Sequence, residues 1–129
     1  MGSATSEHYD DIPYRQLPID AVDWAYTTDH IQNRSRRKRR PEFDVQPEWA
    51  TEAALNFDRL VQNSGSRSGE SIAVIGFSST ADRILVVILV PKDHPPGGEW
   101  WGASAWAANE KDSRVYEAQK GSTSAGERP

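Results

Sequence analysis

Hydrophobic and polar positions divide the chain into a polar start, a strongly patterned middle and a polar end. Three strand-like segments follow one another in the middle: Ser71–Phe77, Ile84–Val90 and Glu99–Trp106. The second is an unbroken run of β-branched residues and leucine, which is typical of a strand buried on both faces and central in its sheet. With the turn at Ser78–Asp82, the first two segments predict a hairpin.

Strict alternation along the third segment predicts two faces. One face would carry Trp100, Gly102, Ser104 and Trp106, and the other Trp101, Ala103 and Ala105. The adjacent tryptophans would then point to opposite sides of the sheet. Trp106 is a candidate to stack on an unpaired base, because aromatic rings on a sheet serve that purpose in nucleic-acid-binding proteins. The alternative is that it is a large core residue.

Weaker signals outside this region predict one further strand and three helices. Alternation over Val22–Tyr26 indicates a short strand, and the capping residues Thr27–Asp29 then begin a short helix that carries His30. Pro47–Leu55 and Glu110–Gln119 are the other two predicted helices. This order predicts an α+β fold: a small antiparallel sheet of about four strands, two N-terminal helices and one C-terminal helix.

Composition sets the limits of the folded domain and excludes several kinds of chemistry. Residues 1–16 and 120–129 are polar and predict disordered tails, which leaves a single domain over residues 17–119. The chain has no cysteine and three scattered histidines, so we expect no disulfide, no metal site and no cofactor. No apolar run approaches the roughly 20 residues of a membrane span, which predicts a cytoplasmic location.

Positive charge is concentrated in one short segment. Six of the seven residues at positions 34–40 are basic, in a chain with a net charge of -4: Arg34, Arg36, Arg37, Lys38, Arg39 and Arg40. Without them, nine basic residues stand against 19 acidic ones, a net charge of -10. A block of like charge repels itself and is not packed into a core. It predicts a basic arm that binds a nucleic acid, and the alternative is a solvated loop without a specific role.

Six stretches carry a family resemblance: Trp49–Leu55, Asp58–Leu60, Arg67–Gly76, Arg83–Val90, Ala103–Ala105 and Arg114–Glu117. They resemble BrnT-type toxins of bacterial type II toxin–antitoxin systems, which share the RelE-like ribonuclease fold. That family has a "GE.R...IG" hairpin, an "ISAR.A" strand and an "RR.Y" helix at the C-terminus. This chain departs from the pattern at Trp106, which stands where the family has an arginine.

The resemblance implies a cytoplasmic endoribonuclease that cleaves RNA without a metal and is neutralised by a cognate antitoxin, with oligomerisation left open. In such a reaction the ribose 2′-hydroxyl attacks the adjacent phosphate, which requires a base and cations. His30 or a carboxylate would be the base, and the phosphate would be bound by Arg34, Arg67, Arg83 and Arg114. The alternative interpretation is that each of these side chains lies at an ordinary surface position and has no functional role. The alternative function is a non-catalytic nucleic-acid-binding or protein-interaction module of the same fold.

Overall fold

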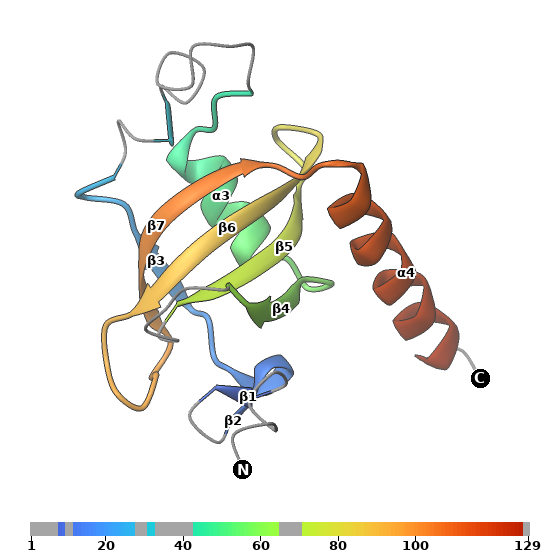
Figure 1. Ribbon diagram of the computed structural model, residues 1–129, viewed down its shortest axis with the longest axis horizontal. Helices are drawn as coiled ribbons and strands as arrows, with labels where there is room; N and C mark the ends of the chain where they lie inside the picture. The colour runs from blue at the N-terminus through green and yellow to red at the C-terminus, as the bar shows by residue number, and fades with distance from the viewer. Residues whose placement is uncertain (1–7, 10–11, 28–30, 33–42, 65–70, 128–129) are drawn as a thin grey trace.

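The computed structural model describes residues 8–9, 12–27, 31–32, 43–64 and 71–127 (Figure 1). A small pair of strands and a 3-10 turn come first, followed by a larger sheet and two α-helices. The elements in chain order are β1 (His8–Tyr9), β2 (Ile12–Pro13), η2 (Tyr14–Gln16), β3 (Ala21–Asp23), α3 (Pro47–Ala54), β4 (Leu60–Asn63), β5 (Ile72–Ser78), β6 (Arg83–Pro91), β7 (Glu99–Ala107) and α4 (Glu110–Glu127).

The large sheet has five strands in the order β3-β7-β6-β5-β4. Strands β4 to β7 form an antiparallel meander, whereas β3 runs parallel to β7 at the edge. The fold is α+β, but the prediction of about four antiparallel strands and three helices is wrong, because the sheet is mixed and the described residues form two α-helices. Of the expected first helix, only Ile31 and Gln32 lie in the described part of the chain, and both are helical.

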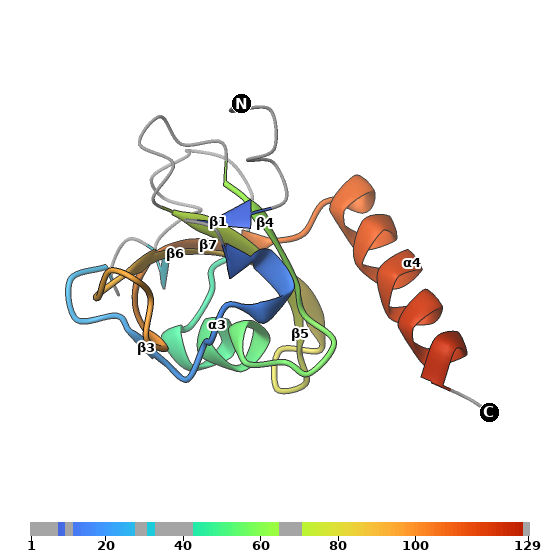
Figure 2. The same cartoon turned by 90° about the horizontal axis from the view of Figure 1, so that it is seen from below.

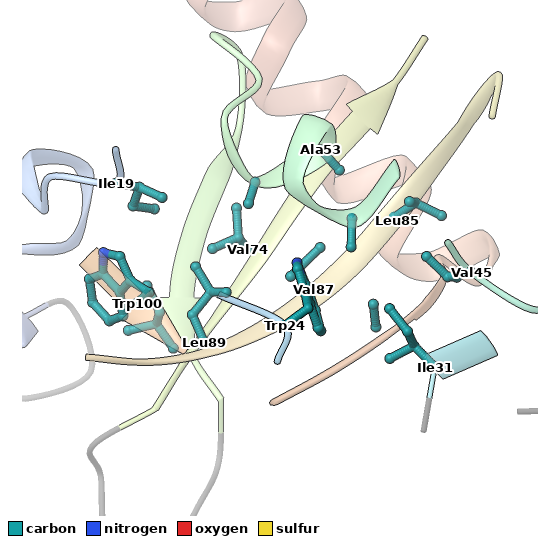
Figure 3. Packing of buried hydrophobic residues seen from close by; sticks show 14 of the residues in the cluster. Ile19, Trp24, Ile31, Val45, Ala53, Val74, Leu85, Val87, Leu89 and Trp100 are labelled. Carbon is teal, nitrogen blue, oxygen red and sulfur yellow. The ribbon is translucent and has the colours of Figure 1, made fainter. Parts of the chain in front are cut away.

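Three strands of the meander, β5, β6 and β7, confirm the apolar pattern, whereas β4 was not predicted. β6 lies in the middle of the sheet, between β5 and β7, as its continuous apolar run indicates. Leu85, Val87 and Leu89 face α3, where they pack in the main core with Trp100 (Figure 3). Val86, on the other face, belongs to a second and smaller cluster. Both faces of β6 are therefore in apolar surroundings.

α3 covers one face of the sheet (Figure 2). It begins at Pro47, as predicted, since a proline at the first helical position needs no backbone donor. Its buried face consists of Ala50, Ala53 and Ala54, and these small side chains let the helix approach the sheet closely. At Gly76 of β5, an added Cβ would overlap the backbone carbonyl of Ala53. The close approach of helix and strand thus requires glycine at this position.

β7 does not keep the strict alternation expected from its sequence. Ile88 pairs with Ser104 and Leu89 with Gly102, so Ala103 is an extra residue in a β-bulge. The bulge moves every later side chain to the opposite face. Ala105 is consequently buried in the main core, while Trp106 packs against the second cluster. The predicted faces are wrong from Ser104 onward because a bulge leaves no mark in the hydrophobic pattern.

Tyr116 is the buried residue that attaches the described part of α4 to the sheet. Asn109 Oδ1 accepts a hydrogen bond from the backbone N–H of Asp112 at 2.7 Å and caps the helix. Tyr116 is only 1% exposed, and its hydroxyl donates to Asn56 Oδ1 at 2.8 Å. Burial raises the pKa of Tyr116. The helix continues to Glu127, beyond its predicted end and into the range expected to be a tail, and extends away from the sheet (Figure 2).

Candidate nucleic-acid interface

The basic run itself lies outside the described residues, but the chain on both sides of it is described. Ile31 and Val45 are fully buried in the main core and lie side by side (Figure 3). The backbone N–H of Val45 donates to the carbonyl of Ile31 at 3.1 Å, and Gln32 Nε2 donates to Gln46 Oε1 at 2.7 Å. Residues 33–42, which we call the basic loop, therefore leave the core and return to it at one place, beside the N-terminal end of α3.

The two ends of the basic loop are fixed by residues that are buried in the core, Ile31 before it and Val45 after it. The basic arm predicted over residues 34–40 lies outside the described residues and stays a prediction. Six of the residues in this segment are cationic. The rest of the chain carries a net charge of -10, so a polyanion would be attracted at the loop and repelled elsewhere.

Arg83 is exposed at the start of β6 and is oriented by aromatic rings next to the return point of the basic loop. Its Cζ lies 4.2 Å from the centroid of the Phe43 ring, and Phe43 stacks in turn on Trp49 with centroids 5.7 Å apart. Within the described part of the chain, Arg83 forms no ion pair. Stacking fixes the plane of a guanidinium and leaves its N–H groups available for bidentate contact with phosphate.

The carboxylate of Glu52 lies on α3 near the start of β6 and is fully engaged. It accepts hydrogen bonds from Ser78 Oγ at 2.6 Å, Ser79 Oγ at 2.8 Å and the backbone N–H of Thr80 at 3.0 Å. These donors, with Ser78 foremost, lower the pKa of Glu52 to about 2. A carboxylate with such a pKa is a weak base at neutral pH. Its role is to hold the β5–β6 turn against α3.

Arg114 is on the opposite side of the sheet from Arg83. Arg83 stacks on Phe43, which packs with the main core on the α3 face, whereas α4 docks through Tyr116 on the other face. Arg114 Nη1 forms an exposed ion pair with Glu110 Oε2 at 3.2 Å, as their spacing predicts. The structure therefore does not bring the two arginines together on one surface.

The structure does not place the remaining predicted site residues beside Arg83. His30 and Arg67 lie outside the described residues. Trp106 is half-buried against the second apolar cluster on the face that α4 contacts, where its stacking role stays a prediction. In the described ranges, no group of three His, Asp or Glu side chains is placed to hold a metal ion.

The sequence did not single out a second aromatic group, formed by Tyr26 and Trp101. Their ring centroids are 5.4 Å apart with the planes tilted by 52°, and Tyr26 is 84% exposed. Lys92 Nζ lies 4.2 Å from the centroid of the Trp101 ring and 2.9 Å from Asp23 Oδ2. The hydrogen bond from Lys92 lowers the pKa of Asp23. Tyr26 stands at the end of a strand that the sequence predicts, which could have marked it as a surface aromatic residue. Its partner Trp101 is 75 residues away in the chain.

No protein-family model, curated protein or solved structure matches this chain. The resemblance to BrnT-type toxins therefore stays a prediction from short motifs. As to membranes, neither of the described α-helices combines the length and the apolar character needed to cross one.

Proposed function

We propose that this protein binds RNA at the basic loop and at the neighbouring Arg83. The observation that carries the proposal is the hydrogen bond between Val45 and Ile31, because it ties both ends of a segment with six cationic residues to one place on an otherwise acidic molecule. Phosphate groups supply most of the affinity in such contacts, through release of bound counterions. A cytoplasmic location belongs to this proposal, since RNA is the expected target.

Arg83 adds a contact of defined geometry to the charge of the loop. It lies on Phe43, which follows the loop directly in the chain, so an RNA strand bound to the loop would pass near the guanidinium. Arginine matches the two oxygens of a phosphate better than lysine does. The choice of RNA over DNA rests on the family resemblance, and single-stranded DNA is therefore included in the test.

The proposal is tested by measuring the affinity for a labelled RNA at several salt concentrations. We expect log Kobs to fall linearly with log salt, by about 0.7 for each phosphate contact on a single strand. Reversing the charge of Arg36, Arg37, Arg39 and Arg40 should abolish most of this slope, and Arg83→Gln should reduce it by about one contact. Lys111→Gln, which removes an exposed charge on α4, is the matched control.

Binding that does not depend on salt, or that survives charge reversal of the loop unchanged, would contradict the proposal. The basic loop would then be a solvated segment without this role. If Lys111→Gln and Arg83→Gln lowered the affinity for RNA equally, the binding would instead be a general attraction by net charge, with no defined surface.

RNA cleavage, by a BrnT-like toxin paired with an antitoxin, is the second candidate function. The observation that favours it is the oriented guanidinium of Arg83, which suits the stabilisation of charge that develops on a phosphate. Glu52 is a poor candidate for the base because its pKa is about 2. Inducing the chain in a bacterium should arrest growth and degrade RNA, and His30→Ala should prevent both. Normal growth with intact RNA would leave binding as the function.

A further inference from the structure

Helix α4, the longest helix of the described chain, turns a mostly polar side toward the sheet. Among its side chains that the structure describes, at positions 110–119, only Tyr116 is buried. Asp112, Ser113 and Gln119 share that side of the helix by their spacing and are partly buried. Beyond them the helix extends away from the sheet (Figure 2). Because little apolar surface is buried in this contact, α4 is weakly held.

The interactions that begin α4 are internal to the helix. Asn109 Oδ1 accepts a hydrogen bond from the backbone N–H of Asp112 at 2.7 Å, so the N-terminal cap belongs to the helix itself. Arg114 Nη1 pairs with Glu110 Oε2 at 3.2 Å on the exposed side. These contacts do not involve the sheet and are kept when α4 leaves it. The helix can therefore leave as one unit.

The hinge for such a movement lies between Ala108 and Asn109. The backbone N–H of Ala108 donates to the carbonyl of Ile84 at 2.9 Å, which continues the pairing of β7 with β6. Asn109, the next residue, already caps the helix. A residue fixed to the sheet is thus followed directly by a residue fixed to the helix. A change of the backbone dihedral angles at this junction reorients α4 as a whole.

The site that receives Tyr116 keeps a polar contact when the tyrosine leaves. The hydroxyl of Tyr116 donates to Asn56 Oδ1 at 2.8 Å, and the same oxygen accepts a bond from the backbone N–H of Phe77 at 3.4 Å. Departure of the tyrosine returns its hydroxyl to water and leaves Asn56 Oδ1 bonded to Phe77. The large penalty for a buried acceptor without a partner is therefore avoided on opening.

We infer that α4 is a lid, which opens as one unit about this hinge while the meander stays folded. Opening removes Tyr116 from the second apolar cluster, whose other buried members are Ala73, Ile75 and Val86. The closed form presents a polar helix at this end of the sheet, and the open form presents an apolar surface. The lid lies on the face of the sheet opposite Arg83, so its opening can be measured separately from RNA binding.

Hydrogen exchange of the unaltered full-length chain under native conditions tests the lid. A helix of this length is marginal in isolation, so its amides exchange once the lid is open. The amides of residues 114–119 should show similar protection, at least about ten-fold below that of amides in β6. Low concentrations of urea should change their exchange little, because opening exposes little surface. Exchange in β6 should accelerate with urea, because it requires unfolding of the whole domain.

Two results of this experiment would overturn the lid. Protection that decreases steadily from Arg114 to Gln119 would show that the helix frays from its C-terminal end and does not open as a unit. Equal protection and equal urea dependence in α4 and β6 would show that helix and sheet open only together.

Tyr116→Ala should hold the lid open in a protein that remains folded. The amides of β6 should stay protected, and the fluorescence of anilinonaphthalene sulfonate, a dye that binds exposed apolar surface, should increase at least about ten-fold. Val115→Ala is the matched control, since Val115 is 42% exposed on the same helix, and it should leave the dye fluorescence unchanged. A Tyr116→Ala protein that binds no dye, or whose β6 amides lose protection altogether, would contradict the lid.

Discussion

At the scale of single residues, one carboxylate shows how a side chain from a helix fixes a turn in a sheet. Glu52 extends from α3 to the turn between β5 and β6 and accepts hydrogen bonds from three consecutive residues, Ser78 to Thr80. Glu52 lies beyond the first turn of α3, where the helix dipole contributes little. The turn contacts are the larger cause, since they lower the pKa of Glu52 to about 2.

Replacing this carboxylate should remove stability in a way that depends on pH. Folding lowers the pKa of Glu52 from 4.5 to about 2, so its ionised form stabilises the folded protein above pH 4.5, and this contribution is lost as the pH falls toward 2. Glu52→Gln should cost about 1 kcal/mol at neutral pH, after allowance for solvent screening. Melting temperatures of both proteins measured across that interval should converge at low pH.

Glu48→Gln serves as the control for this experiment, because Glu48 is an exposed carboxylate one turn earlier on α3. Its replacement should shift the melting temperature little at any pH. A constant difference between Glu52→Gln and the unaltered protein from neutral pH down to pH 2 would show that the lowered pKa is not the cause.

At the scale of elements, Tyr116 attaches α4 to the rest of the molecule. The buried ring of Tyr116 and its hydrogen bond to Asn56 connect the helix to the end of α3. Asn56 Oδ1 also accepts a bond from the backbone N–H of Phe77 at 3.4 Å, so one amide group links α4 to β5. A helix of this length with a polar sequence is marginal in isolation, and its docking depends on this contact.

Variants of Tyr116 should separate the contribution of the ring from that of the hydroxyl. Tyr116→Phe should cost about 1 kcal/mol of unfolding free energy, since only the hydrogen bond is lost. Tyr116→Ala should cost about 3–5 kcal/mol because a large buried ring is removed. Urea unfolding measures both, and hydrogen exchange should report selective loss of protection in α4. The exposed neighbour Val115, changed to alanine, should have little effect.

At the scale of the whole molecule, the first strand of the large sheet pairs with the last. β3 lies parallel to β7, and Trp24 passes beneath Gly102 to donate from Nε1 to Thr51 Oγ1 of α3 at 3.0 Å. This contact joins the residue after β3, the neighbouring strand β7 and α3. Tyr26, which packs on Trp101, is two residues after Trp24, so its position depends on this contact.

Gly102→Ala should loosen this junction. An added Cβ would overlap the ring of Trp24, and displacing a buried indole in a packed core costs about 1–3 kcal/mol. Urea unfolding should show that loss as a lower free energy of unfolding. Gly97→Ala is the matched control, since its added Cβ would meet only Asp93 at 3.7 Å. Unchanged stability of Gly102→Ala would contradict this account.

Residues with strong local patterns were predictable, and those placed by distant contacts were not. The central position of β6 follows from its apolar run, and the start of α3 follows from Pro47. The bulge at Ala103 was not predictable, because its sequence alternates as well as a regular strand does. The position of Arg83 at the start of a strand could be predicted. Its stacking on Phe43 could not, because it depends on where the chain returns after the basic loop.

The sequence by itself determined the strands β5, β6 and β7, the helix α3 that covers them and the concentration of positive charge in residues 34–40. These features depend on the period of apolar positions and on neighbours along the chain. Only the tertiary structure decided that β3 closes the sheet in parallel, that the basic segment is tied at both ends, and that Tyr26 meets Trp101. Each of these depends on pairing between distant segments, for which the local pattern holds no information.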